Sequence, residues 1–144
     1  MANTSDGMTY NPGGQSKPVV EPGEFLFGVA ALDHAHIDGM ATALEGAGAQ
    51  LKRIYDPNRE KAEAFQKKFP QAAVASSLYE LLDDPDIRCI AAAAIPNERC
   101  GLGMKVMDAG KDYFTDKCPF TTLEQLGRAR EKALETDRKY MVYF

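Results

Sequence analysis

The residues best suited to chemistry follow four apolar runs of this chain. They are Ala31-Leu32-Asp33-His34-Ala35-His36, Asp56, Ile95-Pro96-Asn97 and Asp116-Lys117. A carboxylate can accept hydrogen bonds from sugar hydroxyls, a lysine can assist the deprotonation of an alcohol, and a histidine can transfer protons or bind a metal. These four stretches are therefore the candidate site residues, and their value depends on whether the fold brings them together.

Residues 25–56 are typical of a strand–helix–strand unit that binds a dinucleotide. Phe25–Leu32 and Leu51–Tyr55 are apolar enough for buried strands, and His36–Glu45 between them carries apolar residues at helical spacing. The fingerprint of such a unit is G-x-G-x-x-G with an acid about 20 residues further on. In this chain the three glycine positions hold Ala31, Asp33 and His36. The scaffold is present, but its phosphate-binding turn is altered.

The altered turn allows two interpretations. Asp33 would add bulk and negative charge where the backbone must approach a pyrophosphate closely. The N-terminus of the following helix still offers free N–H groups, and a protonated His34 or His36 would offset part of the repulsion. On the second interpretation the turn binds no phosphate.

Asp56 ends the second expected strand, 25 residues after Ala31. An acid there accepts hydrogen bonds from the adenosine ribose and repels a 2′-phosphate, which favours NAD over NADP. Arg59, one helical turn further on, keeps NADP open. The alternative is that Asp56 only caps a helix that begins at Pro57.

The sequence His34-Ala35-His36 also suggests a metal site, because such sites recruit further histidine or carboxylate ligands from later strands. These are the only two histidines of the chain, so a histidine-rich site cannot be completed. A carboxylate-rich site stays open, but we expect no metal.

Lys117 follows the fifth expected strand, where it can bind a substrate hydroxyl and assist its deprotonation. The alternative is a solvated loop lysine, paired with Asp116. A further G-x-G in Cys100-Gly101-Leu102-Gly103 lies inside an expected helix, so we interpret it as close helix packing.

Strands and helices alternate along the rest of the chain. Further strands are expected at Ala72–Ala75, Arg88–Ile95, Lys111–Thr115 and Lys139–Phe144. Helices are expected at Pro57–Phe69, 77–82, 97–109 and 122–136, and capping boxes open the second (Ser77 to Glu80) and the fourth (Thr122 to Gln125). This alternation predicts an α/β fold with a doubly wound, six-stranded parallel sheet in the order 3-2-1-4-5-6. The candidate site residues would then meet at the carboxyl ends of the strands.

Composition limits the class of protein. The chain has 144 residues, which suits one domain, and a net charge of −4 without a basic run, which argues against nucleic acid. Its apolar runs are too short to cross a membrane. Three cysteines without a C-x-x-C pair favour a reducing compartment, so we expect the cytoplasm. Residues 1–23, rich in Gly, Pro, Ser and Asn, are expected to be a flexible leader, and residues 24–144 the folded domain.

The ordered set of short motifs resembles the N-terminal domain of the glucose–fructose oxidoreductase / inositol dehydrogenase family (Gfo/Idh/MocA). The motifs are Tyr55-Asp56-Pro57-Asn58, Ser76–Asp86, Ala94-Ile95-Pro96-Asn97, Ala109-Gly110-Lys111, Asp116-Lys117 and Thr122–Leu126. The resemblance covers about residues 25–144. It implies a Rossmann domain that binds NAD(P), in enzymes that oxidise or reduce sugars, cyclitols or polyols. It assigns contact with the nicotinamide ribose and the substrate to Lys117, and it places Pro96 and Asn97 near the nicotinamide.

The chain departs from the family pattern in four ways. Ala31 and Asp33 replace glycines, Cys118 replaces the proline that follows the lysine, and Cys100 stands where many members have histidine. Fourth, members continue into a second α/β domain that closes the substrate site, whereas this chain ends at Phe144. Since hydride transfer needs both walls of the cleft, we expect cofactor binding but little or no turnover.

Two functions therefore remain open. The first is the cofactor domain of an NAD(P)-dependent oxidoreductase. The second is a non-catalytic, degenerate Rossmann module that binds a small ligand or a protein partner. In either case Lys139–Phe144 is expected to be an apolar edge strand through which the chain self-associates.

Overall fold

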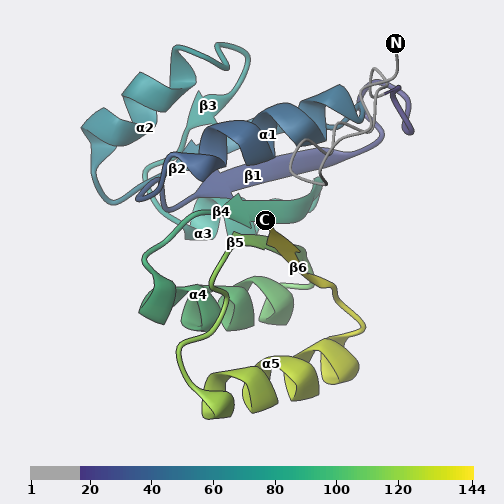
Figure 1. Cartoon of the computed structure of the whole chain (residues 1–144). Helices are drawn as coiled ribbons and strands as arrows, with labels where there is room; N and C mark the ends of the chain where they lie inside the picture. Colours follow the sequence, from purple (N-terminus) through teal and green to yellow (C-terminus); the bar gives the residue numbers. More distant parts are fainter. Residues whose placement is uncertain (1–16) are drawn as a thin grey trace, which may run out of the picture.

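The computed structural model describes residues 17–144, which contain a six-stranded parallel sheet between layers of helices (Figure 1). The strands are β1 (Leu26–Ala30), β2 (Gln50–Tyr55), β3 (Ala73–Val74), β4 (Ile87–Ala92), β5 (Asp112–Asp116) and β6 (Tyr140–Tyr143). The helices are α1 (His36–Gly46), α2 (Arg59–Gln66), α3 (Tyr79–Leu82), α4 (Pro96–Asp108) and α5 (Leu123–Thr136). The strand order is β3-β2-β1-β4-β5-β6, and every neighbouring pair is parallel. The predicted doubly wound α/β fold is confirmed.

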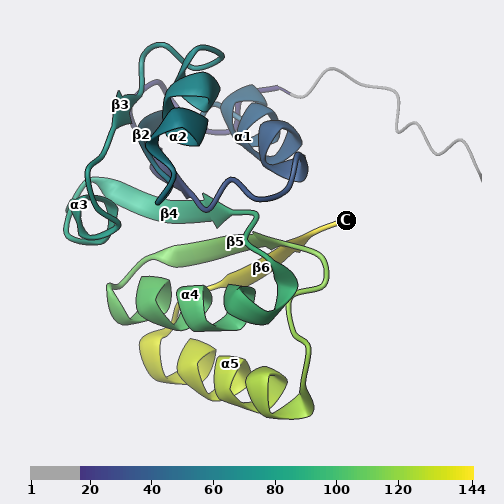
Figure 2. The same cartoon turned by 90° about the vertical axis from the view of Figure 1, so that its left-hand side faces the viewer.

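Helices cover both faces of the sheet (Figures 1 and 2). On one face, Ile37 and Met40 of α1 and Phe65 of α2 pack with side chains of β1, β2 and β4. On the other, Leu81 of α3 and Val106 of α4 pack in a second cluster. α5 lies against α4 in a smaller third cluster. Because both faces are covered, β4 is apolar at nearly every position.

The sequence predicted close helix packing at both glycines of α4, and the structure bears this out at Gly103 but not at Gly101. A Cβ on Gly103 would lie 2.7 Å from ring carbons of both Tyr113 and Tyr140, whereas a Cβ on Gly101 would meet nothing within 4 Å. Gly103 therefore lets α4 approach β5 and β6 closely.

Two helix starts differ from the expected ones, because neighbouring polar side chains compete for the same backbone groups. Asn58 caps α2, and its side chain accepts hydrogen bonds from the N–H groups of Glu60 and Lys61, so α2 begins at Arg59 and not at Pro57. The expected Ser77 capping box is absent from α3, where Glu80 instead accepts from the N–H and hydroxyl of Ser76. The predicted Thr122 cap of α5 is confirmed, since its hydroxyl accepts from the N–H of Gln125.

The expected leader is only partly described. Residues 1–16 lie outside the described part of the chain, and residues 17–23 contain no helix or strand. The N–H of Val19 donates to the carbonyl of Ala47, which ties this segment to the end of α1. Within residues 17–144, no helix is long and apolar enough to span a membrane.

Candidate functional site

The four candidate stretches lie at one edge of the sheet (Figure 2). β1, β2, β4 and β5 are parallel neighbours, so the residues that follow them share this edge. Asp56 follows β2 on one side of β1, and Lys117 follows β5 on the other side. The Leu32–His36 turn and Ile95–Asn97 lie between them.

Ala31 keeps the backbone geometry of the glycine it replaces. Its φ of 56° is in the left-handed region that glycine favours. Its N–H donates to the carbonyl of Tyr55 (3.2 Å), and its carbonyl accepts from the N–H of Ala93 (3.0 Å). This position therefore has a conformation that glycine adopts without strain, and the methyl group of Ala31 adds a cost of about 1–2 kcal/mol.

The negative charge of Asp33 is paired with a lysine that lies outside the turn. Its carboxylate accepts a 2.8 Å hydrogen bond from Nζ of Lys61 in α2, and this bond raises the pKa of the lysine. The negative charge expected beside a pyrophosphate is thus partly compensated by a partner that the sequence did not reveal.

Asp56 organises the turn between β1 and α1. Its Oδ2 accepts the N–H of Leu32 at 2.7 Å, and its Oδ1 accepts the N–H of Asn58 at 2.8 Å. The carboxylate is 7% exposed. Since Asn58 caps α2, the alternative that Asp56 serves only as a helix cap is wrong. Arg59 pairs with Glu63 along the exposed face of α2, at 2.7 Å.

Asp116 is the centre of a buried network at the end of β5. Its Oδ1 lies 2.8 Å from Nδ1 of His36 and accepts the N–H of Lys117, also at 2.8 Å. Its Oδ2 lies 3.2 Å from Nδ1 of His34 and 3.3 Å from the guanidinium of Arg99. Burial raises the pKa of Asp116, but the bonds from His36 and Lys117 and the charge of Arg99 outweigh it, so the net effect lowers the pKa.

Arg99 is a site residue that the sequence analysis missed. Although charged, it is 2% exposed, and it donates to the carbonyls of Ala94 (2.6 Å) and Cys118 (3.1 Å) as well as to Asp116. It therefore joins the loops that follow β4 and β5. The sequence feature that could have indicated a buried Arg99 is its position beside the apolar face of the expected helix 97–109.

Lys117 is exposed at this edge, and its peptide bond to Cys118 is cis. Among residues 17–144, its amine makes no ion pair, so the alternative of a pairing with Asp116 is wrong for the side chain. Ile95, Pro96 and Asn97 are exposed at the start of α4, where Ile95 is the N-cap and Pro96 the first helical residue.

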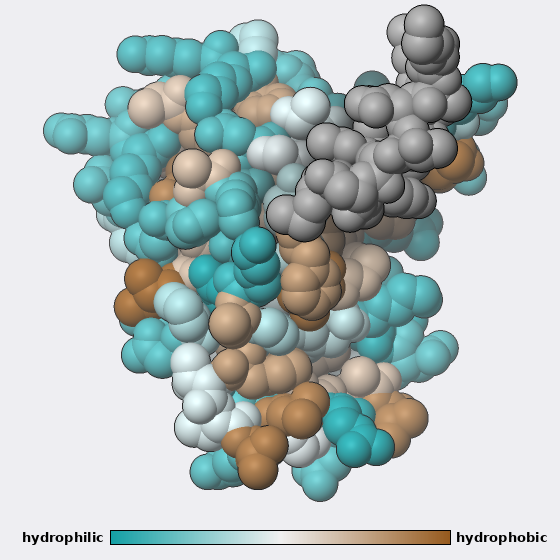
Figure 3. Space-filling view, in the orientation of Figure 1, coloured by the Kyte–Doolittle hydropathy of each residue, from teal (hydrophilic) through white to brown (hydrophobic). Residues whose placement is uncertain are grey.

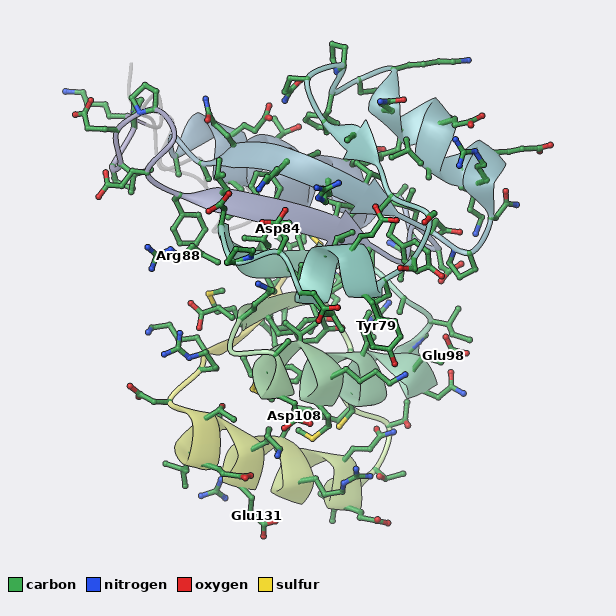
Figure 4. The ribbon with its side chains drawn as sticks, turned by 180° about the vertical axis from the view of Figure 1, so that it is seen from behind. Tyr79, Asp84, Arg88, Glu98, Asp108 and Glu131 are labelled. Carbon is green, nitrogen blue, oxygen red and sulfur yellow. The ribbon has the colours of Figure 1, made fainter. Side chains whose placement is uncertain are left out.

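A cavity of about 600 Å³ opens beside the turn, at the carboxyl ends of β1, β2 and β4. Its walls include Ala31, Tyr55, Ser77, Tyr79, Ala94 and Glu98. Figure 4 shows Tyr79 of α3 and Glu98 of α4 near one another on this side of the molecule. Of these six residues, the sequence analysis proposed only Ala31 as a site residue. A larger hollow of about 760 Å³ lies near the amino end of β2, around Val20 and Gln50, and away from the candidate residues.

The comparisons with known proteins agree with this geometry. Residues 26–144 match the Gfo/Idh/MocA family, described as an oxidoreductase family with an NAD-binding Rossmann fold. The chain belongs to this family. As a Gfo/Idh/MocA domain it binds NAD through the Rossmann fold described above.

One curated relative and two solved structures are similar to this chain. The inositol 2-dehydrogenase/D-chiro-inositol 3-dehydrogenase of Lacticaseibacillus casei is 32% identical over 79% of this chain and 33% of the relative. A solved protein of Erwinia carotovora atroseptica SCRI1043 is 39% identical, with a TM-score of 0.79, over 83% of this chain and 36% of the other. The WlbA dehydrogenase of Bordetella pertussis, solved with NADH and UDP-GlcNAcA, is 21% identical, with a TM-score of 0.76. The match covers 88% of this chain and 36% of the WlbA chain. The chain thus spans about a third of the length of each of these three proteins.

Proposed function

We propose that this chain is the cofactor-binding half of an NAD-dependent oxidoreductase that acts on a hydroxyl–carbonyl centre of a cyclitol, sugar or related polyol. The observation that carries the proposal is the position of Asp56 and Lys117 on either side of a turn that keeps glycine geometry at Ala31. The likeness to an inositol dehydrogenase supports the substrate class. NAD supplies the chemistry when bound, by accepting or donating a hydride.

We place the adenosine half of the cofactor at the cavity beside Tyr55, next to Asp56 in the chain. Each oxygen of Asp56 uses one lone pair on a backbone N–H, which leaves a second lone pair on each for the ribose hydroxyls. The same carboxylate disfavours a 2′-phosphate, and Arg59 is engaged with Glu63, so we propose NAD over NADP. The pyrophosphate would lie on the N-terminus of α1, beside His34 and His36.

The nicotinamide would then lie toward Ile95, Pro96, Asn97 and Lys117. The exposed amine of Lys117 would bind the reacting hydroxyl and assist its deprotonation. Asp116 holds the backbone N–H of Lys117, which orients this loop. A second wall must come from outside these 144 residues, so we expect little or no turnover from the chain alone.

Activity is tested by joining the chain to whatever its reading frame encodes beyond Phe144. With NAD⁺ and myo-inositol or a related polyol, the longer protein should reduce the cofactor, and Lys117→Ala should abolish this while leaving NADH binding within about threefold. A longer protein that binds NADH but reduces no NAD⁺ with any polyol would refute the substrate class. Failure to bind NADH would refute the cofactor site itself.

We also propose that the chain self-associates through the free edge of β6. Among residues 17–144, β6 pairs only with β5, and the side chain of Phe144 is 86% exposed. Leu123 and Leu134 of α5 are also exposed, and Figure 3 shows apolar surface at the end of the molecule that α5 forms. Light scattering at about 100 μM should report a dimer or larger species, and a monomer at that concentration would refute the proposal. The cytoplasmic location stays a prediction.

A further inference from the structure

Three metal-ligating side chains lie together at the carboxyl edge of the sheet. Nδ1 of His34 is 3.2 Å from Oδ2 of Asp116, and Nδ1 of His36 is 2.8 Å from Oδ1. Ligand atoms of the three residues all lie within 4.8 Å of one another. We propose that His34, His36 and Asp116 bind one divalent transition-metal ion, such as zinc, through two imidazole nitrogens and one carboxylate.

The contacts of His34 point to a cation between it and Asp116. The backbone N–H of His36 donates to Nδ1 of His34 at 3.3 Å, so this nitrogen is unprotonated, and a metal ion would take its lone pair from this long hydrogen bond. The same nitrogen faces Oδ2 of Asp116, which is also only an acceptor when ionised. Two acceptors at this distance repel each other unless a proton or a metal ion lies between them, and a proton on Nδ1 would exclude the hydrogen bond from the N–H of His36. A metal ion about 2.0–2.2 Å from each atom would supply that charge.

The carboxylate of this trio is fixed, while the histidines are accessible. Asp116 is 1% exposed and held by Arg99 and by the N–H of Lys117. The histidine side chains are 51% and 36% exposed, so an ion and a coordinating water can reach them. Small rotations of these exposed rings would bring both nitrogens to coordination distance.

The donor set determines which metals are favoured. Two imidazoles and one carboxylate suit Zn²⁺, Co²⁺, Ni²⁺ or Fe²⁺, whereas Mg²⁺ and Ca²⁺ prefer oxygen ligands alone. The sequence analysis expected no metal because the chain has only two histidines. The fold supplies the third ligand from β5, 80 residues away from His36.

The charge of Arg99 sets the expected strength of the site. Its guanidinium lies 3.3 Å from Oδ2 of Asp116 and opposes a second cation there. We therefore expect binding weaker than in a closed structural zinc site, with a dissociation constant in the micromolar range. This proposal needs only the three side chains, two of which, His34 and His36, also lie where we place the pyrophosphate of the cofactor.

The test is a titration of the full 144-residue chain, first freed of metal, with Zn²⁺ by calorimetry and with Co²⁺ by absorption. One equivalent should bind, and His34→Ala or His36→Ala should each weaken binding at least tenfold while far-UV circular dichroism stays unchanged. Cys118→Ser is the matched control, because Cys118 is the one exposed thiol among the described residues. This variant should bind Zn²⁺ like the wild type.

A second readout needs no variant. Long-range ¹H–¹⁵N spectra should show both Nδ1 resonances shift on addition of Zn²⁺, and the chain has no other histidine to confuse the assignment. No saturable binding below 1 mM would leave an ordinary hydrogen-bonded His–Asp cluster and overturn the proposal. Binding that survives both histidine variants, or that is lost in Cys118→Ser, would also overturn it. A parallel NADH titration keeps this outcome separate from that of the cofactor site.

Discussion

Asp56→Asn is the substitution that most sharply tests the role given to the turn between β1 and α1. The carboxylate accepts two backbone N–H groups, from Leu32 at 2.7 Å and from Asn58 at 2.8 Å, while 7% exposed. An asparagine offers one acceptor oxygen, so its amide group would face one of these N–H donors. The loss of one charge-assisted hydrogen bond to a buried carboxylate should cost about 1.5–3 kcal/mol.

Urea unfolding followed by far-UV circular dichroism measures this loss, since the chain has no tryptophan. For an m-value of about 1.5 kcal/mol/M, the midpoint should fall by about 1–2 M. Asn58→Ala is the matched control: it removes the α2 cap and should cost only about 1 kcal/mol. An Asp56→Asn midpoint equal to that of the wild type, or higher than that of Asn58→Ala, would refute the reasoning.

Three further predictions follow from local geometry. Gly103→Ala should destabilise the fold by about 1–3 kcal/mol because its Cβ would meet two tyrosine rings at 2.7 Å. Gly101→Ala, the matched control, should stabilise the fold by up to about 1 kcal/mol because its Cβ would meet nothing within 4 Å. Equal urea midpoints for the two variants would contradict this prediction. Burial raises the pKa of Asp84, but hydrogen bonds from Lys52 and Arg53 outweigh it and lower the pKa to about 2. Because the pKa is depressed in the folded state, about 2 kcal/mol of stability present above pH 4 should be lost as the pH falls toward 2. The stability of Asp84→Asn should fall less steeply over the same pH range. A thiol reagent at neutral pH should modify only Cys118 rapidly, since Cys89 and Cys100 are buried, and Cys118→Ser should abolish the fast phase.

The fold could be predicted from the sequence because its signals are local. An apolar strand such as β4 and the helical stripe of α1 are each encoded within about ten residues, and topology rules then fix the strand order. Helix starts were less predictable, because Asp56, Asn58, Ser76 and Ser77 all offer capping groups and tertiary contacts select among them. Asp56 turned out to be engaged by Leu32, 24 residues earlier in the chain.

The site was predictable only in part, because tertiary contacts between distant parts of the chain determine much of it. Asp56 and Lys117 could be placed because parallel strands end at one edge. The network around Asp116 joins the β1–α1 turn, α4 and β5, and no spacing in the sequence encodes those contacts. Arg99 and the cavity walls from α3 were missed because their role depends on how separate loops approach one another.

The most direct test of the central claim is a titration of NADH with the purified chain, followed by nicotinamide fluorescence. A saturable change below millimolar concentration, weakened at least tenfold in Asp56→Asn but not in Asn58→Ala, is the predicted result. No saturable change at millimolar NADH, or equal binding by Asp56→Asn and the wild type, would contradict a nicotinamide nucleotide site at this edge of the sheet.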